Sequence, residues 1–491
     1  MDEDWWLEQL QQLKMNEKRL DVLTNMYTTI NKQGALPRQI LEKLLREPLI
    51  YECALIENAA KEPLVNLTID FIGSCLEQLQ LDMSDEKLPK LLQLTLNHSN
   101  PAVRALVLKQ LQRQAGKPSQ ELLLYVLDEL QQPETLSSTA AINILAKALV
   151  EPELKNASVQ SKLLQLLKQN EVVRCRAYEL GVKLAKSSAA TLSAVEFILD
   201  AALSELDNDD VLLQASVMEI LVPLAEQNHG LSYMERRRVF DIFSSRVQRL
   251  EEHPLDALLI PSIMKFFGKI AAVQPQKILT GYPHMLLQLF ELLQSGDETV
   301  LPTAMDTLAN LAGSNTGKIL LHKQYETQML QALSKFATYT KHLSPLLKVR
   351  LLNALDMIYA RESSNSAEVE LSNILKLWFE SFAGGQQLDH IMELLHTPFP
   401  DLQLAALALM KTLCLYDWGI LSLKNTGGAV EFLLSRQRDL HKDVKYVKWQ
   451  ILEQLCASDK FAPSEILRFT AYVNEGPYYV QADVSIATEP Q

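Results

Sequence analysis

Hydrophobic residues recur along this sequence at the spacing of an α-helix, and short polar or proline-containing turns separate the runs. In the stretch 100–111, Val103, Leu106, Val107 and Leu111 fall at positions i, i+3, i+4 and i+8. On a helix such positions share one stripe of the surface. The pattern therefore predicts amphipathic helices, each with one face to bury.

These predicted helices are organised as a degenerate repeat. Each repeat has a polar or proline turn, then an apolar residue, a small residue, and leucines at helical spacing. The segments that show it are 100–111, 132–145, 170–184, 208–221, 297–311, 346–358, 399–413 and 442–452. The small residues of the first four segments are 35, 37 and 38 positions apart: Ala105, Ala140, Ala177 and Ala215. A period of about forty residues is typical of HEAT and armadillo arrays, in which stacked helix pairs complete one another's core.

We therefore predict an all-α fold, a curved α-solenoid of HEAT/armadillo-like repeats that occupies residues 1–476. The polar stretch 361–370 and the glycine pair within 382–389 are too short to be linkers between domains. They mark a region, near 361–389, where the array could bend. Residues 477–491 are predicted to form an extended C-terminal cap and tail.

Composition and charge narrow the kinds of partner and compartment. The formal net charge is −13, which disfavours nucleic acid because Lys and Arg must neutralise phosphates. The first residues, MDEDWWLEQLQQLK, are acidic where a secretory signal is basic, and no stretch approaches the ~20 apolar residues that cross a bilayer. The five cysteines never form CxxC, which suits a reducing compartment. We expect a cytoplasmic and also nuclear monomer with no nucleic-acid or membrane partner.

One segment has a superficial likeness to a nucleotide-binding loop. In GSNTGK (313–318) the glycine spacing is one residue short of GxxxxGK, and Ile319 stands where a Ser or Thr would hold magnesium. The segment also follows a predicted helix rather than a strand, so we interpret it as an inter-helix turn. The histidines show no zinc-ligand spacing, and no HExxH, GxSxG or Cys–His signature occurs. We expect no enzyme activity, cofactor, metal or small-molecule substrate.

Polar residues on otherwise apolar helices are the candidates for partner binding. Glu219, Asp306 and Asn353 each lie close in sequence to the small residue of a repeat. The inner helices of a curved array line its concave surface, where their polar side chains can meet a ligand. An ordinary solvent-facing position explains any one of the three at least as well. Trp418 is expected to pack at the end of a helix.

The sequence NEGPYYVQADVS (474–485) departs from the helical pattern. Gly476 and the proline after it should end the last helix, because glycine is common just past a helix and proline cannot continue one. A lone extended segment has no strand partner in a helical array. We predict that residues 477–480 fold back over the final helices as a cap, with the chain beyond about 484 disordered. Contact of Tyr478 and Tyr479 with a partner protein is the alternative.

Several segments together resemble a known family. They are VVRCRAYEL (172–180), MKFFGKIAA (264–272), GSNTGK (313–318), FPDLQLAAL (399–407), Trp418 and NEGPYYV (474–480). In this order and at these positions they resemble the 26S proteasome non-ATPase regulatory subunit 5 family. The resemblance covers about residues 170 to 480, and the N-terminal third rests on the repeat alone.

This resemblance implies an assembly chaperone for the base of the 19S regulatory particle. Such proteins bind the C-terminal domain of one ring ATPase of the AAA class and leave as the particle matures. The assembly intermediate also holds a neighbouring ATPase and the largest non-ATPase base subunit. The repeat by itself also fits a general scaffold or a transport adaptor of the importin type, although the repeated inner-face Trp and Asn pairs of those arrays are not found.

Overall fold

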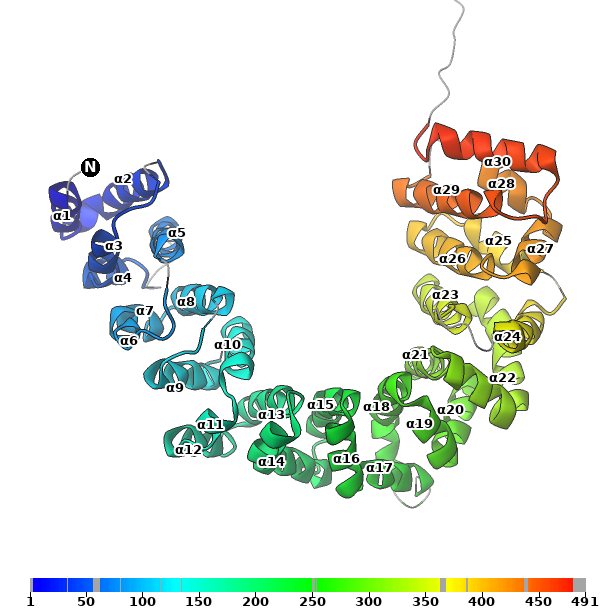
Figure 1. Cartoon of the computed structure of the whole chain (residues 1–491), viewed down its shortest axis with the longest axis horizontal. Coiled ribbons are helices and arrows are strands. Elements are labelled where there is room, and N and C mark those ends of the chain that lie inside the picture. Colours follow the sequence, from blue (N-terminus) through cyan, green and yellow to red (C-terminus); the bar gives the residue numbers. More distant parts are fainter. Residues whose placement is uncertain are drawn as a thin grey trace, which may run out of the picture. The chain divides into compact units, whose positions relative to one another are not determined.

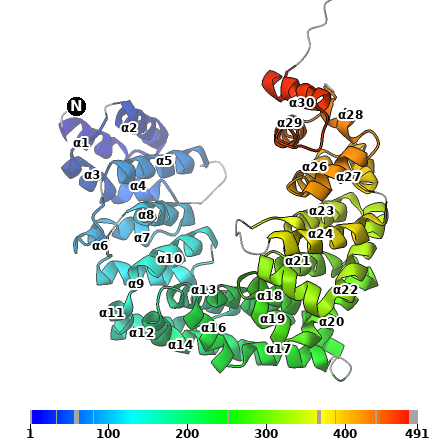
Figure 2. The ribbon, with the colours of Figure 1, turned by 45° about the vertical axis from the view of Figure 1, so that its right-hand side comes forward.

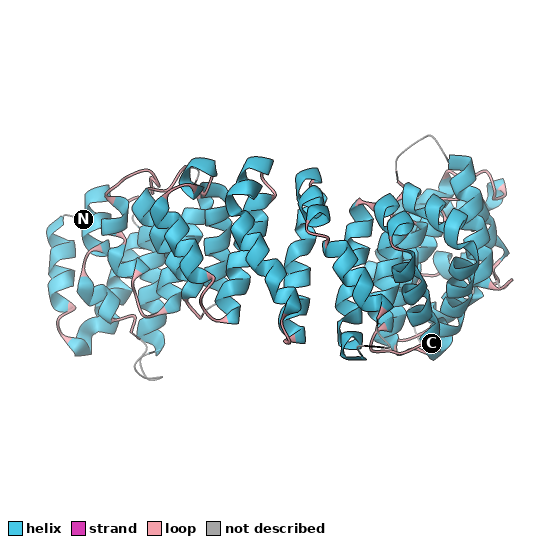
Figure 3. Cartoon of the chain, turned by 90° about the horizontal axis from the view of Figure 1, so that it is seen from below, coloured by secondary structure: helices cyan, strands magenta, loops and turns pink. Residues whose placement is uncertain are grey.

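The computed structural model describes residues 3–32, 34–55, 62–79, 81–114, 116–133, 135–249, 252, 254–362, 368–385, 387–436 and 440–479. Within these ranges every regular element is a helix and no strand occurs (Figure 3). The chain forms two compact units, Met1–Arg236 and Arg237–Gln491. Both are stacks of short helices, so the prediction of an all-α solenoid of HEAT/armadillo-like repeats is confirmed.

The first unit runs from α1 to α16 (Figure 1). Its helices are α1 (Glu3–Gln12), η1 (Asn16–Lys18), α2 (Arg19–Lys32), α3 (Arg38–Leu45), α4 (Pro48–Glu52), α5 (Glu62–Gln78), α6 (Leu88–Leu91), α7 (Gln93–Leu96), α8 (Pro101–Arg113), α9 (Gln120–Asp128), η3 (Glu129–Gln131), α10 (Thr135–Ala148), α11 (Glu151–Leu154), α12 (Ala157–Leu166), α13 (Glu171–Ala185), α14 (Ala189–Ser204), η4 (Glu205–Asp207), α15 (Val211–Leu221), η5 (Val222–Glu226) and α16 (Asn228–Arg236).

The second unit runs from α17 to α30. Its helices are α17 (Val239–Gln248), η6 (Pro254–Leu259), α18 (Ile260–Val273), α19 (Pro275–Gly281), α20 (Pro283–Ser295), α21 (Leu301–Leu311), α22 (Asn315–His342), α23 (Pro345–Tyr359), α24 (Glu368–Ala383), α25 (Asp389–Leu395), α26 (Pro400–Leu413), α27 (Asp417–Asn425), α28 (Ala429–Leu434), α29 (Lys442–Cys456) and α30 (Pro463–Glu475). The region near 361–389, where the sequence suggested a bend, lies in and around α24 inside this unit; the bend itself stays a prediction.

Each unit is built from two layers of helices. In the first unit α2, α5, α8, α10, α13 and α15 pack side by side in that order, and we call this row layer A (Figure 1). Helices α3, α9, α12 and α14 pack against it as layer B. In the second unit layer A consists of α18, α21, α23, α26 and α29 (Figure 2). Layer B of that unit includes α20, α22, α25, α28 and α30, with α24 beside α22 and α27 beside α28.

The turns between these helices carry the residues that start them. Pro101, Pro400 and Pro463 are the first residues of α8, α26 and α30, where a missing N–H leaves no bond unmade. The Asn100 side chain accepts a hydrogen bond from the amide of residue 102 at 3.0 Å. Asp210 accepts from two first-turn amides of α15 at 2.8 and 3.1 Å. Such caps satisfy donors that the helix itself leaves free.

Many side-chain hydrogen bonds between neighbouring repeats span about forty residues, and those that join α23 or its end to α26 or its end span 56 and 57. The separation is 43 residues for Thr307 and the Met264 carbonyl, 46 for Tyr339 and the Leu293 carbonyl, and 40 for Lys183 and Asn143. Each of these bonds joins one repeat to the next. The structure thus confirms the predicted period of about forty residues.

The core of the second unit depends on close approach of layer A helices. Phe266 and Phe267 are only 1% and 2% exposed, and their rings contact Phe240 of α17. Gly268 lies so near α21 that a Cβ there would come within 3.0 Å of the Thr307 Cα atom. A larger residue at 268 would therefore push α18 and α21 apart.

The GSNTGK segment (313–318) contains the end of the turn between α21 and α22, as the sequence predicts, but its residues from 315 onward already form the first turn of α22. Lys318 is fully buried, and its ammonium donates to the Ala360 carbonyl at 2.6 Å and, more weakly, to the Gly313 carbonyl at 3.4 Å. Burial lowers the pKa of Lys318 to about 8. The lysine that would meet a phosphate in a nucleotide-binding loop instead ties together the C-terminal ends of two layer A helices.

Candidate functional site

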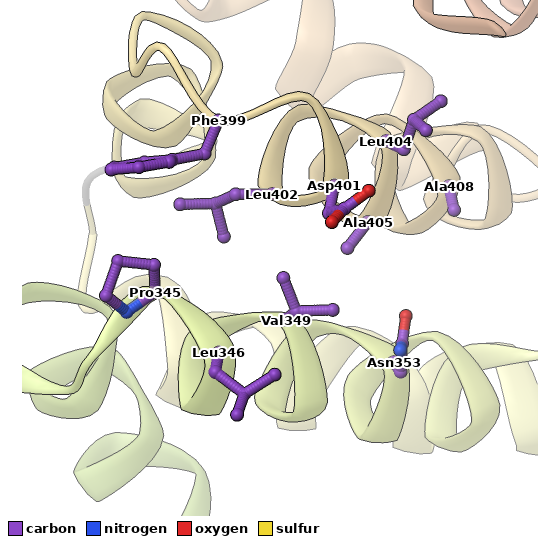
Figure 4. A pocket seen from close by; sticks show the side chains of 10 residues that line it. All are labelled: Pro345, Leu346, Val349, Asn353, Phe399, Asp401, Leu402, Leu404, Ala405 and Ala408. Carbon is purple, nitrogen blue, oxygen red and sulfur yellow. The ribbon is translucent and has the colours of Figure 1, made fainter.

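An open groove lies on layer A of the second unit, between α23 and α26 (Figure 4). Its volume is about 570 Å³. Four lining residues come from α23, namely Pro345, Leu346, Val349 and Asn353. The others come from α26 and the residue before it, namely Phe399, Asp401, Leu402, Leu404, Ala405 and Ala408. We call this site the α23–α26 groove.

Several apolar side chains that line the groove are exposed to solvent. Leu346 is 73% exposed and Phe399 is 48% exposed. Figure 4 shows Val349 of α23 pointing toward Ala405 of α26, whose short side chain leaves the space between the helices open. Exposed apolar side chains around a concavity are typical of a site where a partner buries an anchor residue.

Two polar side chains complete the lining. Asn353, one of the residues predicted from sequence, is exposed on α23, and Asp401 is exposed in the first turn of α26. Asp401 is the one charged residue of the lining. An acidic group beside an apolar surface favours a partner segment that carries a lysine or arginine next to its apolar side chains.

Asp306, a second predicted residue, lies one helix earlier in layer A. Arg350 of α23 donates a hydrogen bond to the Asp306 carboxylate over 2.9 Å. The Arg350 side chain is 49% exposed and the Asp306 side chain is 48% exposed. Burial raises the pKa of the Asp306 carboxyl, although the Arg350 charge opposes this shift. The ion pair makes Asp306 a link between α21 and α23.

Similar links continue along layer A. Thr412 of α26 donates to Asp356 of α23, and Lys411 of α26 donates to the Gln450 side chain of α29 over 3.0 Å. We call these hydrogen-bonded side chains the polar row of layer A; they are Asp306, Arg350, Asp356, Thr412, Lys411 and Gln450. The polar row extends over α21, α23, α26 and α29, and therefore includes the two helices that form the groove. A protein that covered layer A of this unit would meet both kinds of contact.

The predicted partner-binding residues are distributed over three places. Glu219 is exposed on α15 of the first unit. Asp306 and Asn353 are on neighbouring layer A helices of the second unit. Tyr478 and Tyr479 follow α30 at the end of that unit and are 57% and 45% exposed.

The last helix ends where the sequence predicts, just before Gly476, whose φ is +87°. Arg436 holds this end by donating to the carbonyl oxygens of Gly476 at 2.7 Å and Tyr472 at 2.9 Å. Its guanidinium lies 5.4 Å from the centre of the Tyr479 ring. Both tyrosines are exposed, and the cap over the final helices stays a prediction. Residues 480–491, on which the rest of that prediction falls, lie outside the described residues.

Two further findings concern clusters of metal-ligand side chains and membrane-spanning helices in the described part of the chain. There, no group of three or more His, Cys, Asp and Glu side chains could hold a metal ion. The same residues include no helix long and apolar enough to cross a membrane. Burial lowers the pKa of His390, a buried residue of α25.

Sequence reasoning missed Leu346, Phe399 and Asp401, the residues that define the groove. A signal was present in the pattern. Leu346 and Val349 fall beside the buried stripe of α23 rather than on it, and Phe399 stands between two prolines. An apolar residue outside the buried stripe is a candidate contact for a partner.

The fold is that of a helical-repeat protein of the α-solenoid class, because helix pairs are stacked with a period of about forty residues. The profile of the family described as "Proteasome non-ATPase 26S subunit" matches residues 2–491. A protein of Drosophila melanogaster named "26S proteasome non-ATPase regulatory subunit 5" is 59% identical over 504 aligned positions, which cover 100% of this chain and 99% of the fly protein. The chain belongs to the 26S proteasome non-ATPase regulatory subunit 5 family.

More distant relatives and solved structures are also similar to this chain. The Mus musculus protein of the same name is 29% identical, with 81% of this chain and 82% of the mouse protein covered. The structure of yeast importin-beta (Kap95p) aligns with 94% of this chain and 62% of its own, at 13% identity and a TM-score of 0.46. The assignment to the α-solenoid class rests on the helix layers described above.

Proposed function

We propose that this protein is a chaperone for assembly of the base of the 19S regulatory particle of the 26S proteasome. It binds the C-terminal domain of a ring ATPase of the AAA class and leaves before the mature particle forms. Family membership supports a proteasomal role, because the relatives carry the name of a regulatory subunit. The observation that carries the binding mode is the α23–α26 groove, an exposed apolar site of about 570 Å³ beside a polar row.

In this proposal an apolar side chain of the ATPase domain enters between Leu346 and Phe399. A lysine or arginine next to it meets Asp401. Full burial of one large apolar side chain contributes ~1.5–3 kcal/mol, so the groove alone gives weak binding. The polar row of layer A supplies the remaining contacts, as in interfaces with an apolar centre and a polar rim. Such a mixed interface can be released, which an assembly factor requires.

The proposed role is one of binding rather than catalysis. While it occupies the ATPase, the chaperone prevents contacts that the subunit makes later in assembly. A neighbouring ATPase and the largest non-ATPase base subunit join the same intermediate. We place the protein in the cytoplasm, and also in the nucleus, as a monomer. The net charge of −13 favours encounter with a basic domain, and this contribution weakens as salt is added.

Affinity capture from a cell extract tests the proposal. Wild-type protein should recover base ATPases without subunits of the 20S core. The double substitution Leu346→Asp with Phe399→Asp should reduce that recovery at least about tenfold, since ~1.4 kcal/mol is a factor of ten. Leu467→Asp is the matched control, because Leu467 is 71% exposed on α30, away from the groove.

The outcomes separate the possibilities. Recovery of no proteasome subunit by the wild type sinks the proposal. Recovery of ATPases by the double variant, with an unchanged melting temperature, moves the binding site away from the groove. Capture of unrelated proteins without any base ATPase would favour a general scaffold or transport adaptor instead.

A further inference from the structure

Two exposed apolar side chains on neighbouring layer A helices of the first unit take no part in its core. Val172 is the second residue of α13 and is 59% exposed, and Leu212 is the second residue of α15 and is 79% exposed. The residue that follows each of them, Val173 or Leu213, is buried and belongs to the apolar stripe of its helix. Val172 and Leu212 are therefore apolar residues that the packing of the repeats does not require.

The two side chains occupy the same place in consecutive repeats. Positions 172 and 212 are 40 residues apart, α14 returns the chain between them, and α13 packs against α15 (Figure 1). Parallel helices packed in this way have axes ~8–10 Å apart, so the two side chains project from equivalent turns about 10 Å apart. Leu346 of the α23–α26 groove is likewise the second residue of its helix and precedes a buried leucine. The first unit thus repeats a feature of the groove.

A hydrogen-bond network holds the loop before α15 against α13. The Glu205 carboxylate accepts hydrogen bonds from Arg174 at 2.7 Å and from the Tyr178 hydroxyl at 2.8 Å, both on α13. Asn208, in the loop that leads to α15, donates to the same carboxylate at 3.2 Å. Because these bonds tie the loop to α13, the surface at the start of the two helices exists before any partner binds.

The charged groups beside the two apolar side chains are mainly acidic. Glu171 and Asp209 are exposed, and neither forms an ion pair within the described part of the chain. Arg174, in the first turn of α13, is already paired in the network above, which leaves Lys168 as the exposed base in the turn before α13. An acidic rim around apolar side chains favours a segment with lysine or arginine next to its apolar residues, and it disfavours nucleic acid and anionic lipid.

We propose that Val172 and Leu212 form a docking site, the α13–α15 patch, for an amphipathic helix of a partner protein with lysine or arginine beside its apolar stripe. Residues i and i+7 of a helix are ~10.5 Å apart along its axis, which matches the separation of the two layer A helices. Residues on one face of an extended strand are ~7 or ~13 Å apart, which does not match. The partner helix crosses the first turns of α13 and α15 and places its basic groups against Glu171 and Asp209.

Fluorescence anisotropy of a labelled helical peptide tests the apolar contacts. The peptide consists of alanine, with leucines at i, i+3 and i+7 and lysines beside them. The protein is the full chain with Leu346→Asp and Phe399→Asp, which removes the apolar anchors of the groove. Adding Val172→Ser and Leu212→Ser should weaken binding at least about tenfold, because two apolar contacts are lost.

A matched control places the same substitutions elsewhere. Leu258→Ser with Leu467→Ser, at residues 64% and 71% exposed in the second unit, should leave the affinity unchanged. The acidic rim is tested by Glu171→Gln with Asp209→Asn, which should weaken binding about two- to fivefold at low salt. A peptide with glutamate in place of lysine should not bind, and one with its leucines spread around the helix should bind at least about tenfold more weakly.

The proposal is overturned if the parent protein does not bind the lysine peptide, or if the serine variant binds it as tightly as the parent. Equal binding of the glutamate peptide, or of the peptide with spread leucines, also overturns it. Dimers of the wild type that dissociate in the serine variant, seen by light scattering, would assign the patch to a second copy of this chain instead. The inference does not rest on the assembly role, because the capture of base ATPases is a separate measurement made with the groove variant.

Discussion

Replacing Lys318 by methionine should change how the stability of the second unit depends on pH. The Lys318 ammonium is fully buried and bonded to the Ala360 carbonyl at 2.6 Å. Burial lowers its pKa from the ordinary value of 10.5 to about 8. Methionine has a similar length and no titrating group, so the variant removes this proton equilibrium from the site.

The size and sign of the effect follow from the two pKa values. The unfolded chain holds the Lys318 proton up to about pH 10.5, whereas the folded chain loses it near pH 8. Between those values the unfolded state binds more protons, so stability rises with pH. The full difference corresponds to about 3 kcal/mol at ~1.4 kcal/mol per pH unit. From pH 7 to about pH 9.5 the wild type should gain up to about 2 kcal/mol relative to the variant. Hydrogen bonds to carbonyls favour the charged form, so this is an upper value.

Thermal unfolding of the full chain at a series of pH values measures this gain. At ~2–4 °C per kcal/mol, the melting temperature of wild type minus variant should rise by up to about 8 °C between pH 7 and about pH 9.5. Lys323→Met is the matched control, because Lys323 is on the same helix with its side chain 61% exposed. Parallel pH profiles of wild type and Lys318→Met would refute the reasoning.

Other substitutions test local contacts. Gly317→Ala should destabilise by about 1–3 kcal/mol, seen as a lower melting temperature, because its Cβ would lie 2.0 Å from the Leu311 carbonyl oxygen; Gly281→Ala, with nothing within 4 Å, should change little. Arg436→Met should speed amide hydrogen exchange in α30 alone, since the arginine bonds to two carbonyl oxygens at the end of that helix; unchanged exchange would contradict this. Arg350→Ala should cost less than about 1 kcal/mol in denaturant unfolding, because its ion pair is half exposed, and a larger loss would contradict this assignment.

The repeat architecture could be predicted because its signals are local. Pro101 and Asn100 mark a helix start within a few residues of chain, and the alanine spacing shows the period without any knowledge of packing. The division into two units at residues 236 and 237 has no such mark. The division depends on the contacts among many helices, and the sequence of a single turn does not indicate those contacts.

The candidate site was less predictable, since it depends on which side of each helix stays uncovered. Asn353 was predicted from sequence, whereas Leu346 and Phe399, the apolar residues that line the same groove, were not. Asp306 was chosen as a polar residue on an otherwise apolar helix, and the structure pairs it with Arg350, a residue 44 positions later. Such pairing is decided by stacking of repeats rather than by sequence near the aspartate.

Hydrogen bonds that reach only one repeat along the chain have a consequence for synthesis on the ribosome. Lys318 finds its shorter bond at the Ala360 carbonyl, 42 residues later, so its ammonium stays without that acceptor until residue 360 has emerged. Each repeat is completed by the one translated after it. A nascent chain of this kind exposes unfinished surface mainly at its growing end, which limits the time and area over which it can aggregate during translation.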